Sequence, residues 1–107
     1  MSIWFVSRHP GARNWACEQK LQVNHWCDHL DINKVKAGDI VIGTLPLPLA
    51  VEVCQRGAEY WHLALELPAN LRGVELSTRD LHLLGARLVR YDLSCCRVLP
   101  FDKATHP

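Results

Sequence analysis

The stretch that decides the fold reads D-I-V-I-G-T-L-P-L-P at residues 39–48. Its first half, D-I-V-I-G, is a short apolar run that is typical of a buried strand. Thr44 is expected to cap a helix that starts at Leu45, because a threonine side chain can accept from a free N–H of the first turn. Pro46 and Pro48 then fall in that first turn, where a missing N–H costs little. The stretch therefore predicts a strand followed by a helix.

Similar units lie upstream of this stretch. Residues 2–7 (S-I-W-F-V-S) are predicted to form a buried strand, and the breaker R-H-P-G leads into a helix over residues 12–20. Residues 22–29 alternate between apolar and polar side chains, which indicates a further strand.

The second half of the chain continues the alternation. Residues 60–67 (Y-W-H-L-A-L-E-L) are predicted to form a strand. Ser77 and Asp80 resemble a capping box and predict a short helix that starts there. Residues 86–93 are predicted to form the last strand, and residues 95–99 are a candidate continuation of it.

Alternating strands and helices favour a single α/β domain over residues 1–99, with a mostly parallel sheet flanked by helices. Residues 100–107 are expected to form a mobile tail. The strand order stays open, because the link between the second and third predicted strands is too short to ensure a crossover helix. In such sheets ligands bind beyond the carboxyl ends of the strands, which selects the turns at residues 7–11, 43–46 and 67–68.

Composition and charge exclude several classes of function. The chain has 107 residues, enough for one domain, and 12 lysines and arginines nearly balance 11 aspartates and glutamates. This balance gives no field for non-specific binding of duplex nucleic acid, so a phosphate ligand must be held by local geometry. We find no signal peptide and no apolar run long enough to cross a membrane, and expect a soluble, cytoplasmic protein. The 5 cysteines are expected to be free thiols.

The turn at residues 7–11 carries the side chains best suited to phosphate chemistry. Ser7, Arg8 and His9 offer a hydroxyl, a guanidinium and an imidazole just before a predicted helix N-terminus, whose free N–H groups attract anions. Arginine supplies a planar fork for phosphate oxygens, and histidine can transfer protons near neutral pH. The alternative is an ordinary turn in which Arg8 and His9 are solvated or paired with acids.

The turn at residues 43–46 has the same layout. Gly43 would let a ligand approach the backbone, and Thr44 offers a hydroxyl just before a predicted helix. The alternative here is a plain helix cap without a ligand.

Aromatic and metal-ligating side chains are further candidates for the site. Trp15 lies one turn into the first predicted helix and is the best candidate for stacking on a nucleobase. His25, Cys27 and His29 share one face of a predicted strand and look like metal ligands. A zinc site, however, needs a fourth ligand or a water, and hydrogen-bond partners that orient its ligands. We favour a partly buried structural face there and expect no metal, with His29 as a minor candidate for the ligand site.

Four segments together resemble a small family of accessory proteins of type III CRISPR systems. They are I-W-F-V-S-R-H-P-G-A at residues 3–12, W-x-x-H-L-D at residues 26–31, G-D-x-V-I-G-T-L-P at residues 38–46, and A-x-E-V-C-x-R-G at residues 50–57. The combination of S-R-H-P-G-A with G-T-L-P is specific, whereas either motif alone is weak.

The resemblance implies a Rossmann-like domain related to the CARF sensor domains, which bind cyclic oligoadenylates. It also implies ring-nuclease activity: cyclic tetra-adenylate is opened to linear di-adenylate with a 2′,3′-cyclic phosphate, which switches off the antiviral response. On the matched turns we expect Arg8 and helix N–H groups to hold the phosphate, and His9 or Ser7 to assist proton transfer, without a metal or cofactor. The other matched positions are expected to bind the ligand: Gly11, Gly43, Thr44, Leu45 and Pro46. A ring of four identical nucleotides also suits a homodimer.

Three alternatives stay open. A protein with the same site and no turnover would be a sensor or sponge for the messenger. A histidine phosphatase would use an R-H-G turn after its first strand, but Pro10 interrupts that motif and the chain is short for that fold. The third alternative is a toxin-like or structural partner of a CRISPR complex.

Overall fold

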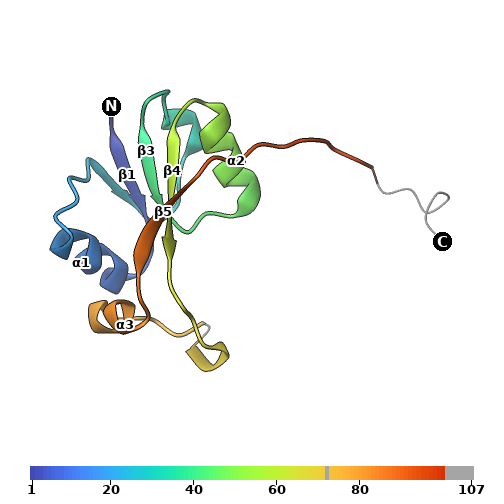
Figure 1. The fold of residues 1–107 in the computed structure, drawn as a ribbon. Helices are drawn as coiled ribbons and strands as arrows, with labels where there is room; N and C mark the ends of the chain where they lie inside the picture. The colour runs from blue at the N-terminus through green and yellow to red at the C-terminus, as the bar shows by residue number, and fades with distance from the viewer. Residues whose placement is uncertain (72, 101–107) are drawn as a thin grey trace, which may run out of the picture.

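The computed structural model describes residues 1–71 and 73–100, and Figure 1 shows their arrangement. Within these residues 5 strands form one sheet: β1 (Ile3–Val6), β2 (His25–Cys27), β3 (Ile40–Gly43), β4 (Glu59–Ala64) and β5 (Arg87–Tyr91). The helices are α1 (Pro10–Glu18), α2 (Leu47–Gln55) and α3 (Thr78–Leu83), with short 3-10 turns η1 (Ile32–Lys34) and η2 (Ala69–Leu71) in the connections. No helix in this described part is long and apolar enough to cross a membrane.

The sheet has the strand order β2-β1-β3-β4-β5, and only its last pair, β4 with β5, is antiparallel. The predicted α/β class with a mostly parallel sheet is therefore confirmed. The chain moves from β1 to β2 on one side and from β3 to β4 on the other, so the direction of winding reverses between β1 and β3. Figure 1 shows α1 and α3 on one face of the sheet and α2 on the other. In open α/β sheets, such a switch point is where ligands usually bind.

Alternate residues of the central strands build two apolar layers. On the α2 face, buried strand residues Trp4, Val41 and Tyr60 pack with Ala50 and Val53 of the helix. The layer on the opposite face contains Phe5, Ala12, Trp15, Ala16, Ile42, Leu63 and Leu81. Because successive strand residues point to opposite faces, the continuous apolar run of β3 is buried on both sides.

The start of α2 differs from the sequence prediction. The helix begins at Leu47, with Pro46 as its N-cap residue, and not at Leu45. The hydroxyl of Thr44 does not cap the helix; it donates to the carbonyl oxygen of Leu63 on β4 at 3.3 Å. Proline disfavours helical backbone at the residue before it, so Pro46 keeps Leu45 in the turn.

The other boundaries are close to those predicted. α1 starts earlier than expected, at Pro10, because proline suits the first helical position. Ser77 and Asp80 form the predicted capping box of α3. Strands β2, β4 and β5 are shorter than expected, and residues 95–99 form no strand. Of the predicted tail, residues 101–107 lie outside the described part of the chain.

A buried carboxylate ties the amino end of β1 to the loop before β3. Asp39 is 5% exposed, and its two oxygens accept hydrogen bonds from the amides of Ser2 (2.9 Å) and Lys36 (3.0 Å) and from Trp4 Nε1 (3.1 Å). Burial acts to raise the pKa of Asp39, but the hydrogen bonds outweigh it and the pKa is lowered.

We expect the free energy of unfolding to fall as the pH falls through the folded-state pKa of Asp39. A carboxyl whose pKa is lower when folded contributes stability above its unfolded-state pKa and loses that contribution in acid. Asp39→Asn should remove this part of the acid sensitivity. It should also destabilise the protein at neutral pH by about 1–3 kcal/mol for each donor left unpaired. The NH₂ group of the asparagine cannot accept the hydrogen bonds that a carboxylate oxygen accepts in its place.

Urea unfolding of the wild type and Asp39→Asn at neutral and acidic pH measures this effect. The pKa of Asp80 is also lowered, chiefly by hydrogen bonds from Ser77. Asp80 therefore makes the same contribution to the pH dependence of stability in both proteins. The difference between the two curves therefore isolates Asp39, and curves that run parallel from neutral to acidic pH would show that Asp39 has no such role.

Candidate functional site

The turns that follow β1 and β3 lie side by side at the carboxyl edge of the sheet. Val6 and Gly43, the last residues of these neighbouring strands, are Cα partners. A Cβ atom on Gly43 would lie 2.5 Å from the carbonyl oxygen of Val6. Close packing of the two strands is therefore one reason for the glycine, and ligand binding at Gly43 stays a prediction. Ser7 and Thr44 begin the two adjacent turns.

The turn after β1 is held in place by its backbone and by Arg13. The amide of Ser7 donates to the carbonyl of Cys27 on β2 at 2.9 Å, and Ser7 Oγ accepts from the amide of His9 at 3.1 Å. Arg13 donates to the Ser7 carbonyl from both Nε (3.1 Å) and Nη2 (2.9 Å) and also pairs with Asp28. The backbone of the turn is thus fixed from two sides.

Arg8 and His9 are exposed on this fixed turn, directly before α1. His9 is the N-cap residue of α1, but its side chain makes no capping hydrogen bond. The start of the helix and the guanidinium of Arg8 both carry positive charge, so an anion at this edge would meet both.

Gly11 packs against another part of the protein. A Cβ atom on Gly11 would lie 2.1 Å from the carbonyl oxygen of Leu76, and the Gly11 carbonyl accepts from Thr78 Oγ1 at 3.2 Å. Glycine is needed here so that α1 can approach the segment before α3. This contact is one reason for the glycine, and ligand binding at Gly11 stays a prediction.

A hollow of about 540 Å³ lies beside that contact, between the start of α1 and residues 75–79. Polar side chains on its walls include Asn14, Glu75 and Arg79. Its volume is in the range of small-ligand sites, and it borders the helix N-terminus that follows Arg8 and His9.

The turn after β3 is anchored to β4. The amide of Leu45 donates to Tyr60 Oη at 3.0 Å, and Leu45 packs partly into the layer under α2. Thr44 and Pro46 are exposed, so their side chains face solvent at the same edge as the first turn. The Thr44 hydroxyl donates to the Leu63 carbonyl and keeps its own lone pairs free to accept.

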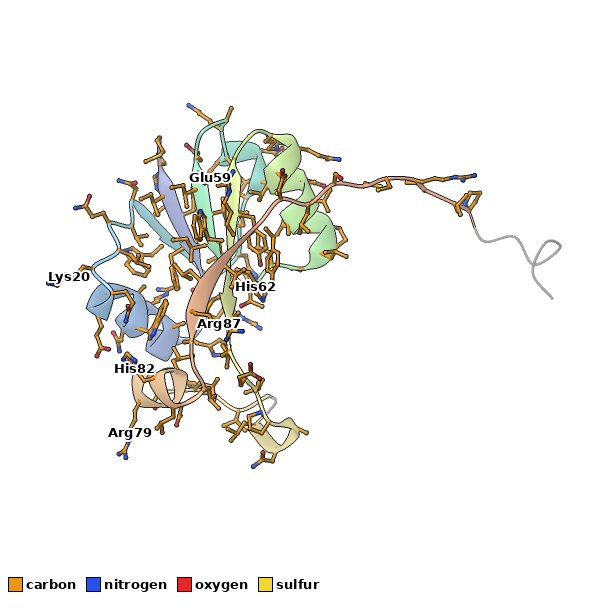
Figure 2. The ribbon with its side chains drawn as sticks, viewed as in Figure 1. Lys20, Glu59, His62, Arg79, His82 and Arg87 are labelled. Atoms are coloured by element: carbon orange, nitrogen blue, oxygen red, sulfur yellow. The ribbon has the colours of Figure 1, made fainter. Side chains whose placement is uncertain are left out.

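Sequence reasoning missed Arg13, Tyr60 and His62. Tyr60 Oη lies 2.7 Å from Nδ1 of His62, and Figure 2 shows His62 next to β5. Burial raises the pKa of Tyr60, which keeps its hydroxyl protonated. The two-residue spacing on β4 could have placed Tyr60 and His62 on one face. Their position beside the β3 turn depends on the strand order, which the sequence left open.

The burial of Trp15 contradicts the prediction that it stacks on a nucleobase. It is only 4% exposed and belongs to the apolar layer between α1 and the sheet, so no free ring face is left for a base. On β2, His25 stacks on Trp4 with ring centroids 4.1 Å apart, so its ring packs against the sheet. Among the described residues, no three or more His, Cys, Asp or Glu side chains are grouped to hold a metal ion.

Comparison with protein families identifies a match over most of the chain. The model of the family described as "Putative CRISPR-associated protein (Cas_VVA1548)" matches residues 4–94. No curated protein and no solved structure matches the chain. The family match spans most of the sequence and includes both turns of the carboxyl edge.

Proposed function

We propose that this chain, which belongs to the Cas_VVA1548 family of CRISPR-associated proteins, is a ring nuclease. It binds cyclic tetra-adenylate and cleaves it at two opposite phosphates, which gives two linear di-adenylates, each with a 2′,3′-cyclic phosphate. By removing the messenger, it ends the antiviral signal of a type III CRISPR system. The reaction uses no metal and no cofactor.

The observation that carries this proposal is the adjacency of the two turns at the switch point between β1 and β3. The motifs S-R-H-P-G-A and G-T-L-P are far apart in the sequence. Val6, just before the first motif, and Gly43, the first residue of the second, are nevertheless direct strand partners. This places a guanidinium, an imidazole, a helix N-terminus and an exposed hydroxyl along one edge, which suits a phosphate-rich ligand.

In the proposed reaction, the 2′-oxygen of a ribose attacks the phosphorus of its own 3′-phosphate. The O2′–P bond forms as the P–O5′ bond breaks, and the 5′-oxygen leaves with a proton. Arg8 and the first amides of α1 stabilise the negative charge on the phosphoryl oxygens. His9 delivers a proton to the departing 5′-oxygen. Ser7 fixes the turn through its hydrogen bond with the His9 amide.

The ligand also suggests how the protein assembles. Four identical nucleotides in a ring match a two-fold axis, so a homodimer would present the same edge to opposite phosphates. The hollow beside α1 would receive one nucleoside from each half of the ring. Light scattering that gives a monomer both with and without ligand would remove the dimer from this proposal.

A non-catalytic binder is the second candidate, and the exposure of Arg8 and His9 favours it. Sites that carry out fast chemistry usually exclude water, which strengthens their electrostatic interactions. A sensor or sponge for the same messenger would use the same edge without needing to exclude water.

Incubation of cyclic tetra-adenylate with excess protein in EDTA, followed by chromatography, tests both candidates. We expect linear di-adenylate with a cyclic phosphate end, because no metal takes part in the reaction. Intact ligand that elutes with the protein would identify a binder. Intact and unbound ligand would contradict the proposed messenger altogether.

A further inference from the structure

Tyr60 is the centre of a hydrogen-bond network that joins β4 to the turn after β3. Its hydroxyl oxygen lies 3.0 Å from the amide of Leu45, 3.2 Å from the carbonyl oxygen of Gly43 and 2.7 Å from Nδ1 of His62. Tyr60 is 2% exposed, so water cannot readily replace these partners. The three partners therefore hold this hydroxyl in one position.

The network selects one tautomer of His62. The Leu45 amide can only donate and the Gly43 carbonyl can only accept, while a tyrosine hydroxyl has a single proton to give. All three contacts are hydrogen bonds only if Tyr60 donates to Gly43 and accepts from Nδ1–H of His62. In neutral His62 the proton therefore sits on Nδ1, and Nε2 carries the lone pair.

Nε2 of His62 is unpartnered and not fully buried. It has no hydrogen-bond partner among the residues that the structure describes. In that same part of the chain, Trp61 Nε1 is the one buried side-chain nitrogen or oxygen without a partner, so the unpartnered Nε2 is not buried. The ring is also braced by Tyr91 of β5, with ring centroids 5.8 Å apart.

His62 lies at the same edge as the two turns. It is the strand partner of Gly43, and it points to the α2 face together with Val6 and Gly43. Gly43 contributes no side chain between Val6 and His62. β1 and β4 are separated only by β3, so His62 and the turn that starts at Ser7 are roughly 10 Å apart across the edge.

From this geometry we infer that His62 is a catalytic base of the site and that Tyr60 is its positioning residue. The inference rests on the proposed function and assigns the group that removes the proton of the 2′-hydroxyl, which the proposed reaction left open. Nε2 of His62 takes the proton of the attacking 2′-hydroxyl as the O2′–P bond forms. The P–O5′ bond breaks, and the 5′-oxygen receives its proton from His9.

The experiment compares single-turnover cleavage of cyclic tetra-adenylate by the wild type and by His62→Ala, with ligand binding measured for both. We expect His62→Ala to bind normally and to cleave on the order of 100-fold more slowly, the lower end of the usual effect of a general base. Added imidazole should restore part of the rate. His25→Ala is the matched control, since His25 is also a strand histidine but is stacked on Trp4.

Tyr60→Phe tests the positioning role separately. It keeps the ring but frees His62 to exchange tautomers, so we expect slower cleavage, unchanged binding and a shifted pH profile of the cleavage rate. A melting curve of Tyr60→Phe controls for loss of fold. A purely structural role for Tyr60 would lower the melting temperature and leave the pH profile in place.

The outcomes separate the two ideas. If the wild type cleaves and His62→Ala cleaves at the same rate, the inference about His62 fails while the proposed function stands. If the wild type itself does not cleave, the proposed function fails and the assignment to His62 fails with it.

Discussion

Arg8→Ala is expected to slow single-turnover cleavage of cyclic tetra-adenylate by on the order of 100- to 1,000-fold, the usual effect of removing one donor that stabilises transition-state charge. The Arg8 side chain is exposed on a turn whose backbone is already held by Arg13 and by β2. The substitution should therefore leave the fold and its melting temperature unchanged. Rapid-quench kinetics with protein in excess over ligand measures the rate directly.

Two further variants sharpen this prediction. Arg8→Lys keeps the charge but loses the planar fork, so it should recover only part of the rate. Arg97→Ala removes another exposed arginine, from the segment after β5, and should cleave like the wild type. If Arg8→Ala and His9→Ala both cleaved at the wild-type rate, the turn after β1 would not be the catalytic site.

Phe5→Ala is expected to destabilise the protein by about 3–5 kcal/mol, as for other buried aromatic side chains. Phe5 is 0% exposed in β1, between its strand partners Trp26 and Ile42. Its ring centroid lies 5.3 Å from that of Trp26. Because small domains are stable by only about 5–15 kcal/mol, the loss is a large share of the total. Urea denaturation measures it.

The controls for Phe5 separate packing from simple hydrophobicity. Phe5→Leu keeps most of the volume and should cost less than about 1.5 kcal/mol. Leu83→Ala removes a side chain that is 74% exposed at the end of α3 and should change stability by less than about 0.5 kcal/mol. Equal losses for Phe5→Ala and Leu83→Ala would mean that β1 is not at the centre of the core.

Local signals in the sequence were enough to predict most of the elements. The apolar run of β3 and the capping box of Ser77 and Asp80 depend on neighbours within a few residues, and both are present in the structure. The start of α2 was misplaced because Pro46 can serve either as a first-turn residue or as the residue outside the helix. Only the path of the chain decides between them.

The candidate site was predicted in part, since its missing members depend on long-range register. The turns at residues 7–11 and 43–46 were recognised from their residue types, but their adjacency follows from the pairing of Val6 with Gly43. The same register brings His62 to this edge. Trp15 was misassigned because a tryptophan on an amphipathic helix can face either the core or solvent, and here it faces the core.

Amide NMR with a cyclic tetra-adenylate analogue that carries 2′-O-methyl groups tests the central claim most directly. The analogue lacks the attacking hydroxyl, so it should bind without being cleaved. We expect shifts that cluster at residues 7–9, 43–45 and 62–64, at the carboxyl ends of β1, β3 and β4. Shifts confined to the amino ends of these strands, around Ile3, Asp39 and Glu59, or no shifts at all, would contradict it.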